Sequence, residues 1–171
     1  MAHPKGADKR LYATWQSIKY RCKHNRWMKD NRPTYDECSY CPEWEEFTPF
    51  EEWALKQKNW DIWQLDKDLL IAGNKVYSPE TCVFVPAWLN TLDKGSPKGY
   101  QIHQGKYRAL MRLDGKTKHL GMFNTAKEAQ QVYLAEKLML ICRLVKDINA
   151  VDVRIFPALR AKYMAMFASI K

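Results

Sequence analysis

The chain has 171 residues, 46% of them hydrophobic, and its 28 Lys and Arg exceed its 19 Asp and Glu to leave a net charge of +9. So many apolar residues exclude a disordered chain, and the length allows one or two small folded domains. No apolar run approaches the length of a membrane span, and the start has no apolar signal-peptide core. We therefore expect a cytoplasmic protein without a membrane partner.

The positive charge is concentrated in the second part of the chain. From residue 99 onward there are 13 Lys and Arg against 5 Asp and Glu, a net +8, while residues 1–98 carry only +1. A small basic region favours a polyanionic partner, most simply nucleic acid, because Lys and Arg displace the counterions condensed on phosphates. The alternative is a basic surface that contacts only water.

The first predicted helix covers residues 11–22. Apolar residues recur there at the spacing of one helical face, at Leu11, Trp15, Ile18 and Cys22. Basic residues lie beside this stripe, at Lys19, Arg21 and Lys23. Their side of the helix either contacts a DNA backbone or is an ordinary solvated surface.

The five cysteines of a cytoplasmic chain are expected to be thiols or metal ligands rather than disulfides. Residues 25–40 predict a loop, broken at Asn31–Pro33, and Cys38 and Cys41 near its end have the Cys-x-x-Cys spacing. Together with Cys22 and Cys82 they could supply four thiolates to a structural Zn²⁺. Alternatively, Cys22 and Cys82 are small buried apolar residues.

A second helix is predicted to begin at Thr48. This residue can cap the helix, Pro49 suits its first position, and Glu51 can return a hydrogen bond to the cap. The residues expected to pack in the core here are Phe50, Trp53, Ala54, Trp60 and Trp63.

The stretch WQLDKDLLIAGNKVYSPETCVFVPAWLN, residues 63–90, predicts two short strands followed by a helix. The first strand carries Asp66 and Asp68, and the helix carries Asn90. The features between them are a turn at Gly73–Asn74, a corner at Ser78–Glu80, a second strand at Cys82–Val85, and Pro86.

Asp66 and Asp68 are two residues apart, so on a regular strand both carboxylates face the same way. They would repel each other unless a cation lay between them, and Mg²⁺ or Mn²⁺ takes such oxygen ligands. The alternative is an exposed acidic face paired with Lys67 or Lys75, although Lys67 is expected to point to the opposite side.

These segments resemble, in the same order, the ββα-metal core of HNH endonucleases of the phage and homing type, over roughly residues 10–92. The matching segments are LYATWQSIKYRC at Leu11–Cys22, CPEW at Cys41–Trp44, FEEWA at Phe50–Ala54, and YSPETCVFVP. The resemblance implies a DNA endonuclease, encoded by a phage and acting in the host cytoplasm. It implies that Asp66 and Asn90 hold Mg²⁺ or Mn²⁺.

The stretch departs from the family at two positions. The family's catalytic His follows the metal-binding Asp directly, where this chain has Lys67, and the family's mid-loop Asn is replaced by Thr81. The general base would then be Asp68, or Lys67 if burial depressed its pKa. A further alternative is a site that binds DNA without cutting it.

Beyond a linker at residues 94–98, the pattern predicts three strands, residues 99–103, 107–113 and 117–123, with a tight turn at Asp114–Gly115. A helix follows, begun by a capping box of Thr125 and Glu128 and continuing towards Arg143. Strand alternation puts Tyr107, Ala109, Met111 and Leu113 on one face of the middle strand and Arg108, Leu110 and Arg112 on the other.

The segment KYRALMRLDGKTKHLGMFNTAKEAQQVY resembles DNA-binding domains of the plant ethylene-response-factor type, over roughly residues 99–141. The resemblance implies that the sheet enters the major groove of double-stranded DNA, with Arg108 and Arg112 anchoring or reading bases. Phosphate contacts are expected from Lys106, Lys116 and Lys118. The alternative is a solvated basic face.

We therefore expect an α+β protein with an HNH-like module at residues 1–93, a sheet-and-helix DNA-binding module at 99–146, and a helical tail at 147–171. The tail, with a helix from Pro157, packs on the rest or forms a homodimer. The expected activity is metal-dependent hydrolysis of double-stranded DNA. The alternatives are a catalytically silent DNA-binding regulator or inhibitor, and an RNA-associated protein.

Overall fold

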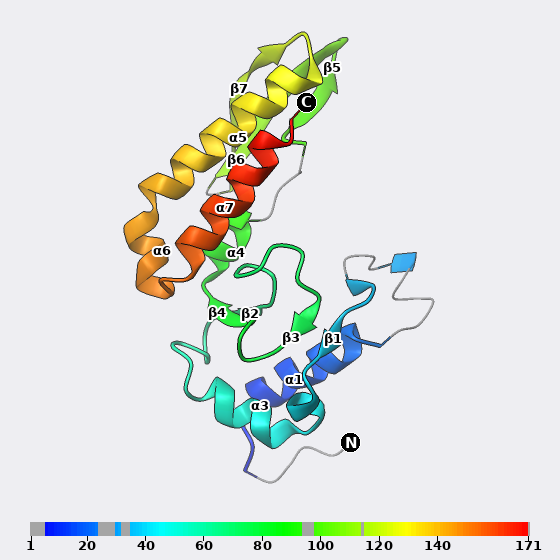
Figure 1. Ribbon diagram of the computed structural model, residues 1–171, viewed down its shortest axis with the longest axis vertical. Coiled ribbons are helices and arrows are strands. Elements are labelled where there is room, and N and C mark those ends of the chain that lie inside the picture. The colour runs from blue at the N-terminus through cyan, green and yellow to red at the C-terminus, as the bar shows by residue number, and fades with distance from the viewer. Residues whose placement is uncertain (1–5, 24–29, 32–34, 94–97, 114, 171) are drawn as a thin grey trace. The chain divides into compact units, whose positions relative to one another are not determined.

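The computed structural model describes residues 6–23, 30–31, 35–93, 98–113 and 115–170 (Figure 1). The protein has the predicted α+β class and divides into two compact units, Met1–Pro86 (unit 1) and Ala87–Lys171 (unit 2). Unit 1 is formally neutral and unit 2 carries the whole net charge of +9. In the described ranges, no helix is both long and apolar enough to span a membrane.

Unit 1 begins with the predicted first helix. Its described elements are α1 (Lys9–Arg21), β1 (Ser39–Tyr40), the 3-10 helix η2 (Pro42–Glu45), α3 (Phe47–Ala54), β2 (Gln64–Asp66), β3 (Val76–Tyr77) and β4 (Val83–Val85). The carboxylate of Asp8 caps α1 by accepting hydrogen bonds from the backbone N–H groups of Arg10 (2.8 Å) and Leu11 (2.9 Å). The predicted apolar stripe of α1 is buried.

The core of unit 1 is built from aromatic rings. Trp44 is completely enclosed; its ring meets Phe50 edge-on at 5.0 Å between centroids and lies 4.9 Å from Trp53. The indole N–H of Trp15 donates to the carbonyl oxygen of Trp44 at 2.8 Å. Trp60 and Trp63 pack against this core as predicted.

The predicted start of the second helix is wrong by two residues. Helix α3 begins at Phe47 after Glu46, so Thr48 is inside the helix and not its cap. The side chain of Glu46 makes no capping hydrogen bond. Instead Phe47 is buried against the rings of Tyr12 (5.2 Å) and Trp15 (5.7 Å), so packing against α1 sets the helix start.

Two strand pairs complete unit 1. Strand β2 pairs antiparallel with β4, as the predicted hairpin requires, with Asp66 opposite Val83. Strand β1 pairs in parallel with β3, a pairing that the sequence did not predict. The part of the predicted loop at residues 24–29 and 32–34 lies outside the described residues.

Unit 2 contains the predicted sheet and helix. Its described elements are α4 (Ala87–Asp93), β5 (Tyr100–His103), β6 (Lys106–Leu113), β7 (Lys116–Phe123), α5 (Ala126–Arg143), α6 (Val145–Val151) and α7 (Ile155–Ala168). The sheet is antiparallel in the order β5–β6–β7. The predicted capping box of Thr125 and Glu128 is confirmed. Asp114 of the predicted turn is outside the described residues, and Gly115 has a φ of 74°.

Helix α5 packs across one face of the sheet, and α7 returns along α5 after the short α6 (Figure 1). Gly99 opens β5 with a φ of 67°, and a Cβ there would lie 2.1 Å from the ring of Tyr133 on α5. Only glycine permits so close an approach of strand and helix. Residues predicted as a tail are part of this unit, because Ile148, Ile155 and Leu159 are completely buried. Helix α7 starts at Ile155 rather than at Pro157.

Helix α4 belongs to unit 2, so the division falls before the predicted linker, of which residues 94–97 lie outside the described part. The reason is a polar anchor at the end of α4. The Nζ of Lys162 donates to both carboxylate oxygens of Asp93, each at 2.8 Å, and the Tyr163 hydroxyl donates to the Asp93 carbonyl oxygen at 3.1 Å.

Lys137 of α5 lies beside this anchor. Its side chain is only 2% exposed, and its Nζ is 5.7 Å from the centroid of the Tyr163 ring. Burial lowers the pKa of Lys137 below its ordinary value of 10.5; Asp93 opposes that shift and Lys162 adds to it.

Replacing Lys137 with Met is expected to change how the stability of unit 2 depends on pH. Between the lowered pKa of folded Lys137 and 10.5, the unfolded chain binds more protons than the folded chain. As pH rises through this range, the free energy of unfolding of the wild type should therefore increase relative to that of Lys137→Met. Urea unfolding followed by the Ile148 methyl NMR signal measures both; parallel pH curves would contradict the prediction.

Candidate functional site

The predicted carboxylates lie where β2 ends. One carboxylate oxygen of Asp66, Oδ1, accepts hydrogen bonds from the backbone N–H groups of Asp68 (2.9 Å) and Leu69 (2.8 Å). These bonds turn the chain immediately after the strand, as Asp side chains commonly do. Asp66 is therefore part of the turn's backbone architecture as well as a charged group.

Asp66 and Asp68 lie close enough to interact. Burial raises the pKa of Asp66, and the neighbouring charge of Asp68 raises it further, while the two backbone N–H groups oppose the shift. The two carboxylates are close together, as expected. The turn after β2 brings them together, because only Asp66 is within a regular strand.

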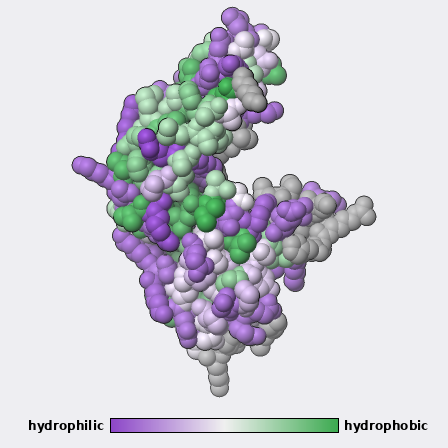
Figure 2. Space-filling model, viewed as in Figure 1, coloured by the Kyte–Doolittle hydropathy of each residue, from purple (hydrophilic) through white to green (hydrophobic). Residues whose placement is uncertain are grey.

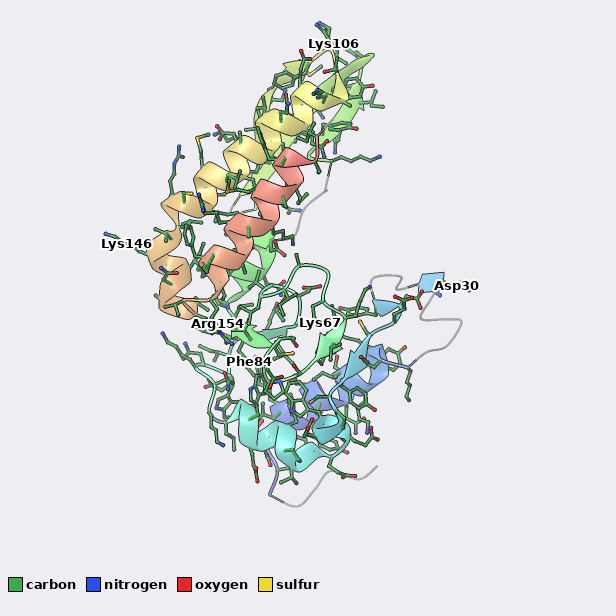
Figure 3. All side chains as sticks on the ribbon, in the orientation of Figure 1. Asp30, Lys67, Phe84, Lys106, Lys146 and Arg154 are labelled. Atoms are coloured by element: carbon green, nitrogen blue, oxygen red, sulfur yellow. The ribbon has the colours of Figure 1, made fainter. Side chains whose placement is uncertain are left out.

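The predicted direction of Lys67 is wrong. Its side chain is buried, at 6% exposure, on the same side as Asp68, and its Nζ donates to Asp68 Oδ2 at 3.1 Å and to the carbonyl oxygen of Asn74 at 2.9 Å (Figure 3). The ammonium also lies 5.8 Å from the centroid of the Tyr77 ring. Strand alternation fails here because β2 ends at Asp66 and the following residues form a bend.

Asn74 and Thr81 hold the loop between β2 and β4. The Asn74 side-chain amide donates to the carbonyl oxygens of Lys67 and Val76, both at 2.7 Å. The Thr81 hydroxyl donates to the Val76 carbonyl oxygen at 2.7 Å and accepts from the Ser78 N–H at 3.1 Å. The Thr81 side chain therefore stabilises the predicted corner at Ser78–Glu80.

Asn90, the predicted partner of Asp66 in metal binding, is a buried residue of α4. It belongs to unit 2 and Asp66 to unit 1. The pairing of these two residues in metal binding therefore stays a prediction.

Several oxygen atoms of the turn already have partners, and a divalent cation held by Asp66 and Asn90 stays a prediction. In the ranges that the structure describes, no three side chains among His, Cys, Asp and Glu are grouped to hold a metal ion. The ammonium of Lys67 is bonded to Asp68, and Asp66 Oδ1 accepts from two N–H groups. A site for Mg²⁺ or Mn²⁺ would instead offer carboxylate oxygens free of a competing cation.

The predicted zinc site is likewise not formed by the four described cysteines. Cys22, Cys38 and Cys82 are buried, and burial raises the pKa of the Cys22 and Cys82 thiols to about 12. Burial raises the pKa of the Cys38 thiol as well. These three cysteines are components of the apolar core, which was the alternative for Cys22 and Cys82.

The predicted DNA-binding residues divide between the two faces of the sheet. The face that packs on α5 includes Ala109 and Met111 of β6, both buried. Pairing puts the following residues on the opposite, open face: Gln101, His103, Lys106, Arg108, Leu110, Arg112, Thr117, His119 and Met122. Lys106 follows the β5–β6 turn at Gln104 and Gly105, both with positive φ (Figure 3).

Lys116 and Lys118 are not on this open face. Lys118 pairs with Met111, on the α5 side, and its Nζ donates to Glu136 of α5 at 3.0 Å. Lys116 is two residues away from Lys118 and shares its side. These two lysines therefore lie on the opposite side of the sheet from Arg108 and Arg112, and their contact with phosphates stays a prediction.

A β-bulge makes β7 depart from simple alternation. Ala109 pairs with Gly121, and Leu110 pairs with His119, so Leu120 is an extra residue in β7. Gln101, His103 and His119 of the open face were not among the predicted site residues. Fixing the register of each strand pair at its turn, and then applying strand alternation, would have placed all three residues beside the arginines.

Arg108 is held by its neighbours on the open face. Its Nη2 donates to the side-chain oxygen of Gln101 on β5 at 3.4 Å. Its Nε is enclosed and is the one buried side-chain polar atom, among described residues, without a hydrogen-bond partner. Arg112 is exposed. Among the open-face residues three are basic and none is acidic, which creates a positive surface.

Comparison of the chain with protein-family models, with curated proteins and with solved structures finds no significant match in any of the three.

Proposed function

We propose that the chain binds double-stranded DNA through the open face of the β5–β6–β7 sheet. The observation that supports this most directly is that face itself: Lys106, Arg108 and Arg112 project from one strand, and no described carboxylate shares the surface. The full +9 charge of unit 2 adds attraction to any polyanion.

The spacing of the two arginines suits a duplex. Arg108 and Arg112 are four residues apart on β6, which corresponds to roughly 13 Å at about 3.3 Å per residue. Successive base pairs are about 3.4 Å apart, so the two guanidinium groups span roughly four steps. Each can bond guanine O6 and N7 through its two-pronged end.

Binding of the full chain to a labelled DNA duplex and to single-stranded RNA of matched length tests this proposal. We expect the duplex to bind more tightly at every salt concentration, with an affinity that falls steeply as salt rises. Equal or tighter binding of the RNA would instead favour the RNA-associated alternative.

A second candidate function keeps DNA binding and adds hydrolysis of the DNA backbone. Its support is the juxtaposed Asp66 and Asp68 at the end of β2, with β4 paired beside them and a helix next in sequence. Asp68 is the more accessible of the two and is the group that could take a proton from water. The Lys67–Asp68 ion pair favours the silent DNA-binding protein instead.

Incubation of supercoiled plasmid with the chain and Mg²⁺ or Mn²⁺, beside EDTA and Asp66→Asn, separates these functions. The Asn variant keeps an oxygen that can accept the turn's N–H bonds while it removes the charge. Nicking that is lost in EDTA and in the variant would establish the nuclease. Intact plasmid with retained duplex binding, which we expect, identifies a silent DNA-binding protein.

A further inference from the structure

The buried ammonium of Lys67 is the feature of unit 1 that the proposed DNA binding does not use. A lysine side chain is rarely enclosed unless its charge is compensated. Here the compensation comes from Asp68 Oδ2 at 3.1 Å, the Asn74 carbonyl oxygen at 2.9 Å and the face of Tyr77. The loop that supplies these groups is fixed in turn by the two hydrogen bonds of the Asn74 amide.

The carboxylates beside this ammonium need a positive charge. Asp66 and Asp68 interact and Asp66 is partly buried, so two negative charges there are costly unless a cation lies beside them. The backbone N–H groups of Asp68 and Leu69 donate hydrogen bonds to one carboxylate oxygen of Asp66, Oδ1. Lys67, the residue between the two aspartates, brings a buried positive charge to this turn through its contact with Asp68.

We infer that the Lys67 ammonium is the built-in counter-ion of the Asp66–Asp68 turn and takes the place of a divalent cation there. The turn then folds and keeps its shape without a metal ion. Removal of the ammonium leaves two adjacent carboxylates and a backbone carbonyl oxygen, the oxygen ligands that a hard cation prefers. The inference does not rest on the DNA-binding proposal.

Titration of the metal-free full chain with Mn²⁺, with free Mn²⁺ counted by electron paramagnetic resonance, tests the inference. We expect the binding curves of wild type and Asp68→Asn to superimpose. We expect Lys67→Met to take up about one additional Mn²⁺ per chain, because Met keeps the stem and removes the charge. The double variant Lys67→Met/Asp68→Asn should lose that ion, and Lys67→Arg, which keeps the charge, should not gain it.

A wild-type chain that binds one Mn²⁺ in a manner abolished by Asp68→Asn would overturn the inference, and this measurement needs no Lys67 variant to fold. A folded Lys67→Met chain without added Mn²⁺ uptake would overturn it as well. Thermal melting gives an independent readout: Asp68→Asn should raise the melting temperature of Lys67→Met but lower that of wild type. Duplex binding by the same proteins shows separately whether the DNA-binding proposal holds.

Discussion

Replacing Arg108 and Arg112 together with Ala should weaken binding of the chain to its preferred DNA duplex by about 30-fold or more. Each two-pronged contact between an arginine and a guanine contributes about 1–3 kcal/mol, and about 1.4 kcal/mol corresponds to a tenfold change in affinity. Both side chains are on the open face, and neither forms an ion pair with a described carboxylate, so little stability should be lost. Fluorescence anisotropy with a labelled duplex measures the change.

The matched control removes two arginines elsewhere in unit 2. Arg143 at the end of α5 and Arg160 of α7 are exposed, and both helices lie on the other side of the sheet from the open face. Arg143→Ala/Arg160→Ala lowers the net charge by the same amount. It should reduce affinity only modestly, and to a similar degree for any DNA sequence. Equal losses in the two double variants would show that binding depends on total charge rather than on this face.

Replacing Trp44 with Ala should lower the free energy of unfolding of unit 1 by about 3–5 kcal/mol, the usual cost of truncating an enclosed aromatic residue. The variant loses the ring contacts with Phe50 and Trp53 and leaves a cavity between η2 and α3. Hydrogen–deuterium exchange read by mass spectrometry measures the effect, because exchange of the most protected amides scales with the free energy of opening. Amides of α1 should exchange at least about 100-fold faster.

Amides of α5 provide the internal reference for this experiment, since unit 2 has its own core around Leu134, Ile141 and Leu159. The control variant is Trp88→Ala, which truncates an exposed tryptophan and should change stability by about 0.5 kcal/mol or less. Faster exchange throughout the chain would mean that the two units unfold as one cooperative body.

Local patterns were sufficient to predict much of the fold. The strands of unit 2 and the helix after them were predicted within a residue or so, because alternation, turn glycines and a capping box are all signals between near neighbours. The helix at residues 9–21 was found from its apolar spacing for the same reason. The β2–β4 hairpin also followed from two short apolar runs on either side of a turn.

The errors occurred where distant residues decide the structure. The start of α3 depends on burial of Phe47 against α1, and the parallel β1–β3 pair joins segments far apart in the chain. The direction of the Lys67 side chain depends on the end of β2 at Asp66, one residue before Lys67. It also depends on the carbonyl oxygen of Asn74, which accepts a hydrogen bond from the ammonium. For the cysteines, the sequence left zinc ligation and burial both open, because spacing alone does not show that Cys22, Cys38 and Cys82 are enclosed in an apolar core.

Figure 2 shows hydrophobic residues over the helices of unit 2, and the exposed side chains of these helices include Met139, Met164 and Phe167. The suggestion that the C-terminal residues also form a homodimer stays a prediction. Sedimentation of the full chain over a range of concentrations would measure it directly.

Because Leu120 is an extra residue in β7, the strand can lose one residue and still pair with β6. If Leu120 were deleted, the pairing of Ala109 with Gly121 and of Leu110 with His119 would become continuous, and every remaining side chain would keep its face. If Thr117 were deleted instead, Leu120 could enter the ladder, and Lys118 and His119 would exchange faces. A single-codon deletion in this strand can therefore change which side chains lie on the open face while the sheet stays intact.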